Sequence, residues 1–77
     1  MFEALLKLGK SGAYPLGELL QHEEKEIRLG AAKSLGKLGS EAASVAPLRG
    51  ALQQHALTDP DPAVRNAAKD AMNLIWH

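Results

Sequence analysis

Apolar residues recur along the chain with the spacing of amphipathic helices. One set lies at i, i+4, i+8 and i+11, which places its members on a single helix face: Ile27, Ala31, Leu35 and Leu38. Each has an apolar counterpart 37 residues later: Val64, Ala68, Met72 and Ile75. Part of the pattern also opens the chain, where Leu5 and Leu8 stand 30 residues before Leu35 and Leu38. Similarity at a regular spacing predicts a repeat protein.

The same periodicity predicts five helices. They are expected over residues 1–8, 13–21, 24–38, 45–52 and 62–76, separated by turns rich in Gly, Ser, Asp and Pro. Gly9 and Gly39 are expected to cap the first and third helices at their C-terminal ends. A turn over Gly9–Gly12 would place Pro15 near the start of the second helix, where its missing N–H does little harm.

Polar and proline residues mark the starts of the last two helices. Ser44 is expected to be the N-cap of the fourth helix, so that Pro47 falls in its first turn. An insertion over residues 53–62 precedes the fifth helix and holds two Asp-Pro pairs, each of which favours a turn. Asp61 as N-cap, followed by Pro62, is a strong start signal for that helix.

These elements predict an all-α fold, because no segment shows strand alternation. We expect one domain over residues 1–77: a short, right-handed α-solenoid of about two and a half helix-pair repeats. A half repeat would cover residues 1–9 and supply a second-type helix without its first, and full repeats would cover 10–39 and 40–77. The expected core takes one face of each helix: Leu5, Leu16, Leu19, Leu20, Ile27, Ala31, Leu35, Leu38, Leu48, Leu52, Val64, Ala68, Met72 and Ile75.

Composition narrows the classes of partner. Nine basic and nine acidic residues give zero net charge, so the chain lacks the phosphate attraction that drives nucleic-acid binding. No stretch approaches the roughly 18 apolar residues of a membrane span, and no apolar leader precedes the first helix. We therefore expect a cytoplasmic protein that binds neither nucleic acid nor membranes.

The polar residues predict no catalytic, cofactor or metal site. His22-Glu23 begins like the zinc motif HExxH, but residue 26 is Glu and the second imidazole is missing. His55 and His77 are scattered, and the chain has no cysteine. The hydroxyl residues other than Ser34 lie at turns, where capping is their ordinary use. An enzymatic role stays open but is not favoured.

Two segments carry a resemblance to a known family. Residues 59–65 read DPDPAVR, and residues 34–39 read SLGKLG. Both resemble the second helix of HEAT repeats, in particular the short repeats of the phycobilisome-lyase type. His22, Asn73 and Trp76 depart from that pattern, which occupies most of the chain otherwise.

The resemblance implies roles for individual residues. It implies that Arg28, Asp59 and Arg65 join neighbouring repeats and are structural. It excludes the iron enzyme deoxyhypusine hydroxylase, because Leu29-Gly30 and Asn66-Ala67 stand where that enzyme has its His-Glu pairs.

For function the resemblance implies protein binding or scaffolding, through the exposed face of the second-type helices or through the open ends of the solenoid. The candidate partner-binding residues on that face are Glu3, Lys7, Leu29, Lys33, Lys37, Asn66, Asp70 and Asn73. Stacking the repeats brings Glu3, Lys33 and Asp70 into a row of alternating charge within salt-bridge reach. The row is either a surface charge ladder or part of a ligand-facing wall. The alternative function is a lyase- or chaperone-like action on a tetrapyrrole-carrying protein.

Apolar residues near both ends predict self-association. The first helix is too short to hide all of its apolar side chains, and Trp76 stands where the family has a glycine. We expect the protein to associate with a copy of itself through Phe2, Leu6 and Trp76, or to be one piece of a longer array. The alternative is a monomer in which Phe2 folds inward and Trp76 covers the last helix pair.

Overall fold

The computed structural model describes residues 2–76, and in that range it contains five α-helices and no strand. The α-helices are α1 (Phe2–Lys7), α2 (Lys10–Leu19), α3 (Lys25–Leu38), α4 (Ala46–Thr58) and α5 (Pro62–Ile75). A short 3-10 helix, η1 (Gly39–Ala42), connects α3 to α4. None of the described helices is both long enough and apolar enough to cross a membrane.

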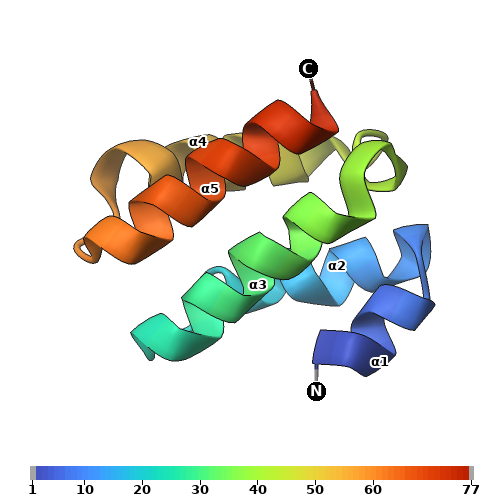
Figure 1. Cartoon of the computed structure of the whole chain (residues 1–77), viewed down its shortest axis with the longest axis horizontal. Coiled ribbons are helices and arrows are strands. Elements are labelled where there is room, and N and C mark those ends of the chain that lie inside the picture. Colours follow the sequence, from blue (N-terminus) through green and yellow to red (C-terminus); the bar gives the residue numbers. More distant parts are fainter. Residues whose placement is uncertain (1, 77) are drawn as a thin grey trace.

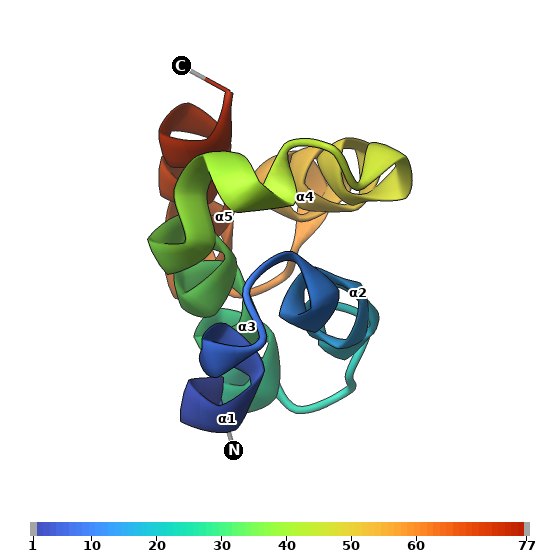
Figure 2. The same cartoon turned by 90° about the vertical axis from the view of Figure 1, so that its right-hand side faces the viewer.

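The helices form two layers (Figures 1 and 2). One layer holds α1, α3 and α5, and the other holds α2 and α4. Each helix of the second layer packs against its successor in the first, α2 on α3 and α4 on α5, while α3 and α5 pack along each other. This alternation confirms the expected short all-α solenoid.

The core lies between the two layers. Most of the expected core residues are buried there, but Leu5, Leu19 and Met72 are only half-buried where they pack against the core, and Ile27 is half-buried as well. The interior also holds small residues and one valine that the apolar pattern did not single out: Ala13, Ala32, Ala42, Val45, Ala56, Ala67 and Ala71. Alanines dominate because short helices that cross closely leave little room for longer side chains.

The first turn is shorter than expected. The prediction of a turn over Gly9–Gly12 is wrong, because α2 begins at Lys10 and only Leu8 and Gly9 separate it from α1. Gly9 reverses the chain with φ 60°, a value that favours glycine. Gly12 is buried directly beneath the Leu5 carbonyl, where a Cβ would clash. Pro15 therefore lies inside α2, away from its start.

The connection to α4 also differs. Ser44 is not the N-cap: α4 begins at Ala46 and its cap residue, Val45, is extended and makes no side-chain cap. The reason is η1, which uses up residues 39–42 of the expected loop and delays the helix. Pro47 still falls in the first turn, as expected.

The inserted residues lengthen α4 instead of forming a loop. The helix continues to Thr58, whose hydroxyl donates a hydrogen bond of 2.8 Å to the Gln54 carbonyl in the last turn. Only residues 59–61 then connect α4 to α5. The start of α5 is as predicted, because the Asp61 side chain accepts a hydrogen bond of 2.8 Å from the Ala63 amide and Pro62 opens the helix.

Candidate functional site

Asp59 lies at the centre of a polar cluster between the two repeats. It follows the last turn of α4, and its side chain is fully enclosed. Arg28, in the first turns of α3, donates to both carboxylate oxygens, from Nε to Oδ2 at 2.9 Å and from Nη2 to Oδ1 at 3.3 Å. This two-pronged geometry matches the planar guanidinium to the planar carboxylate. It joins residues 31 positions apart in the chain.

The same two residues also tie down the adjoining backbone. Arg28 Nη1 donates to the carbonyls of His22 and Glu23, each at 2.9 Å, which fixes the turn before α3. The Asp61 amide donates to Asp59 Oδ1 at 2.9 Å, which shapes the turn before α5. Arg65, one turn into α5, donates to the Asp59 carbonyl at 2.6 Å. The structure thus brings Arg28, Asp59 and Arg65 together across the repeat boundary.

His55 completes the cluster and was not among the residues predicted from the sequence to belong to it. Its Nδ1 lies 2.7 Å from Asp59 Oδ2, so Nδ1 carries the proton and donates it to the carboxylate. The signal in the sequence is the i, i+4 spacing of His55 and Asp59, which has meaning only once α4 is known to extend to Thr58.

The cluster sets the charge state of Asp59. Burial by itself would raise the pKa of this carboxyl, but hydrogen bonds from Arg28, the Asp61 amide and His55 stabilise the anion and lower the pKa below its ordinary value of 3.8. The carboxylate is therefore ionised at neutral pH. All of its strong contacts are internal, so the cluster's evident chemistry is to hold loops together. Within residues 2–76, His, Cys, Asp and Glu side chains form no group of three that could hold a metal ion.

A groove runs along the layer that holds α3 and α5. It has a volume of about 360 Å³, and its floor consists of small residues: Ala32, Gly36, Ala67 and Ala71. Gly36 lets α5 approach closely, since a Cβ there would lie 3.2 Å from Leu74 Cδ1 and 3.5 Å from Ala71 Cα. The α3/α5 groove, as we call it, is therefore a shallow apolar channel between two tightly packed helices.

Charged and apolar side chains line the sides of the α3/α5 groove. Half of the candidate partner-binding residues lie there: Leu29, Lys33 and Lys37 from α3, and Asp70 from α5. Leu74 stands beside them with 54% of its surface exposed. The other four candidates, Glu3, Lys7, Asn66 and Asn73, are exposed on α1 and α5 but do not line it.

A family model described as HEAT repeats matches residues 3–73. The chain belongs to the HEAT repeat family. No curated protein and no solved structure matches it significantly. HEAT repeats mediate protein–protein interaction or scaffolding, and the two-layer stack of this HEAT-repeat chain is in keeping with that.

The expected salt bridges between Glu3, Lys33 and Asp70 do not form in this HEAT-repeat chain, although Lys33 and Asp70 line the same groove. Among residues 2–76, no ion pair within 4.0 Å joins Glu3, Lys33 and Asp70, so the expectation of salt bridges is wrong. All three side chains are exposed, and exposed pairs gain at most about 1 kcal/mol. The fold therefore loses little stability without these pairs.

The residues expected at the self-association surfaces are partly covered within the HEAT-repeat chain itself. Phe2 is half-buried, and its ring fills the space above Gly30 where a Cβ would clash. Leu6 is half-buried too. Trp76 is half-buried beside Arg49, whose guanidinium carbon lies 5.7 Å from the centre of the indole ring. Each end thus keeps only part of its apolar surface open.

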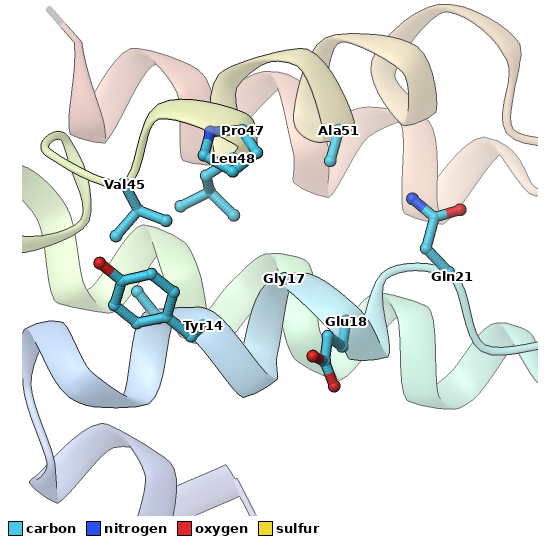
Figure 3. A pocket seen from close by; sticks show the side chains of 9 residues that line it. Tyr14, Gly17, Glu18, Gln21, Val45, Pro47, Leu48 and Ala51 are labelled. Atoms are coloured by element: carbon cyan, nitrogen blue, oxygen red, sulfur yellow. The ribbon is translucent and has the colours of Figure 1, made fainter.

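A second groove lies in the other layer of the HEAT-repeat chain, between α2 and α4 (Figure 3). It has a volume of about 310 Å³ and an apolar floor of Ala13, Gly17, Leu48 and Ala51. This groove was not among the features predicted from the sequence. Its only trace in the sequence is the pair of small residues at i and i+4 on α2, Ala13 and Gly17, and such a pair does not by itself indicate a groove.

Proposed function

We propose that this HEAT-repeat chain is a protein-binding module whose α3/α5 groove holds its partner. The single observation that supports this is the composition of the groove: an apolar floor with exposed charges of both signs on its sides. Interfaces of this kind combine an apolar centre with a polar rim. The Asp59 cluster supports the groove indirectly, because it fixes the relative position of α3 and α5 at one end.

The geometry also defines which contacts a partner would make. An apolar side chain would lie on the Ala32 and Gly36 floor against Leu29 and Leu74, and acidic groups would meet Lys33 or Lys37. Because the rim charges are exposed, they would govern the rate and selectivity of association more than its strength.

Site-specific crosslinking tests the proposal. A photoreactive amino acid at position 33 should crosslink to a partner in cells of the source organism, whereas the same residue at position 69 should not. Lys69 is the matched control, because it is an exposed lysine on α5 that does not line the groove. Binding of the purified partner should then weaken in Lys33→Glu and in Asp70→Lys. Equal crosslinking from both positions, or unchanged affinity in both variants, would place the partner elsewhere.

A narrower function rests on residues 59–65, which resemble the phycobilisome-lyase type of repeat. We propose it second: a lyase- or chaperone-like action on a tetrapyrrole-carrying protein. The match to HEAT repeats in general does not distinguish this subtype. An absorbance scan of the purified protein with added bilin tests it, and a spectrum identical to that of free bilin would count against it.

A further inference from the structure

The groove between α2 and α4, here called the α2/α4 groove, opens on the opposite layer from the α3/α5 groove (Figures 2 and 3). It exists because α2 and α4 pack against each other only sparsely, and one of the places where they approach is Gly17 against Leu48. A Cβ at Gly17 would lie 3.2 Å from Leu48 Cδ1, so the two helices are already in contact at the floor. Beside that contact the two helices leave apolar surface open, including Ala51 and Pro47.

Polar residues mark both ends of the α2/α4 groove. Tyr14 lies at one end, with 55% of its surface exposed and its hydroxyl directed towards Val45. Gln21 projects towards α4 at the other end (Figure 3). Tyr14 and Gln21 are seven positions apart in the chain, and Gln21 lies just beyond the end of α2. At the rise of a helix, seven positions correspond to a length of about 10 Å, or two turns. The open length suits two or three side chains of a partner.

The charge of the residues that line the groove indicates which charge a partner would carry. Among the lining residues, all of which lie in the described part of the chain, Glu18 alone carries a charge. It is exposed on the α2 side of the rim, its carboxylate points away from α4 in Figure 3, and no Lys or Arg among residues 2–76 pairs with it. Arg49, on α4, is engaged with Trp76 instead. A long basic side chain that reaches from the groove over α2 would therefore meet a free carboxylate.

The walls of the α2/α4 groove also restrict the backbone conformation of a partner that could bind there. Both walls are helices, whose N–H and C=O groups are bonded within the helix, so they offer an extended peptide nothing to pair with. A bound helix satisfies its own backbone and presents side chains at i and i+4, the spacing that packs between two helices.

We propose that the α2/α4 groove binds an amphipathic helix of a partner protein, with apolar anchors on the groove floor and a Lys or Arg opposite Glu18. This surface is separate from the α3/α5 groove, so its test does not depend on the function proposed above. It gives the module two faces, each able to hold a different chain.

Selection from a randomised helical peptide library tests the proposal. The library varies the exposed positions of a fixed helical scaffold and is selected against the intact protein. Selected helices should share apolar residues at i and i+4 with a Lys or Arg within one turn. In an amide NMR titration, they should shift Gly17 and Ala51 and leave Gly36 and Ala67 unmoved.

Charge exchange and groove filling make the test specific. Glu18→Lys should weaken the selected helices at least tenfold, and changing their basic residue to Glu should restore binding to that variant. Glu26→Gln, at an exposed position on α3, is the control and should bind as the parent does. Ala51→Leu should fill the groove and block binding, whereas Ala46→Leu on the same helix should not. Three outcomes would each overturn the proposal: no helix is enriched, the selected helices shift amides of the α3/α5 groove, or the charge exchange does not restore binding. Glu18 is exposed, so its variant decides the question even if Ala51→Leu fails to fold.

Discussion

Asp59 is the residue at which α3, α4, α5 and the turn between α4 and α5 meet. Its carboxylate accepts hydrogen bonds from Arg28 of α3, from His55 of α4 and from the Asp61 amide in the turn before α5. Its backbone carbonyl accepts a hydrogen bond from Arg65 of α5. No solvent reaches the carboxylate. Removing one partner from such a buried set leaves the others charged and unpaired, which costs far more than losing a surface contact.

We therefore predict that Asp59→Asn lowers the free energy of unfolding by about 3–5 kcal/mol, since it leaves Arg28 enclosed without its anion. Asp70→Asn is the matched control on an exposed site and should change it by less than about 0.5 kcal/mol. Urea unfolding followed by circular dichroism measures both. Equal midpoints for the two variants would show that the cluster contributes little.

The lowered pKa of Asp59 predicts how this contribution depends on pH. Below its ordinary value of 3.8 the unfolded chain takes up a proton on Asp59 that the folded chain does not yet bind. The contribution is thus complete above about pH 5, falls as the pH drops below 3.8, and is lost once the pH passes the folded-state pKa.

The difference in unfolding free energy between the parent and Asp59→Asn should follow this course, measured from pH 7 to pH 3. Sodium sulfate can be added to both proteins to keep the variant folded. A difference that instead grows as the pH falls would mean that the carboxyl is protonated in the native state.

Part of this cluster could be predicted from the sequence, and part could not. The motif at residues 59–65 and its likeness to HEAT repeats were enough to relate Arg28, Asp59 and Arg65. His55 was missed because its contact depends on where α4 ends. A side chain at i, i+4 meets its partner only when the intervening residues are helical.

At the scale of elements, the connection between α1 and α2 shows packing overriding local signals. Gly, Lys and Ser at positions 9–12 favour a turn when read alone. In the structure α1 lies so closely on Gly12 that the second helix extends back to Lys10 and accommodates Pro15 in its interior. The helix positions could be predicted from periodicity, but this boundary depends on a contact between two helices.

A pair of glycine variants tests that account. Gly12→Ala should destabilise the protein, because its Cβ would clash with the Leu5 carbonyl and push α1 away. Gly50→Ala, in the exposed middle of α4 with nothing within 4 Å, should raise the free energy of unfolding by about 0.5–1 kcal/mol. Thermal unfolding of both should give midpoints that move in opposite directions. A stabilising Gly12→Ala would mean that α1 does not sit on α2 as described.

For the whole molecule, the arrangement of layers could be predicted from the repeat, whereas the space between α2 and α4 could not. The periodic apolar positions determine which face of each helix is buried. How much space two neighbouring helices leave between them depends on the side-chain volumes that meet there, among them Gly17 against Leu48. The space between two helices is not reflected in any periodic spacing of residues along the sequence.

Self-association also belongs to this scale, and it stays a prediction. Apolar side chains remain open at several places, with Leu8 57% and Leu57 67% exposed. We expect light scattering at micromolar concentration to give a mass above 8.2 kDa that falls on dilution. Trp76→Ser should shift the mass towards a single chain. A mass of one chain at every concentration would favour the monomer with its ends folded in.

The contact of Arg49 with Trp76 gives the molecule a built-in optical reporter. Trp76 is the only tryptophan in the chain, and its emission will respond to the nearby guanidinium and so to the pairing of α4 with α5. Tyr14, the only tyrosine, lies in the other repeat. Following both signals during denaturation will therefore show whether the two halves melt together or one after the other. If the Asp59 cluster couples them, the two curves will superimpose.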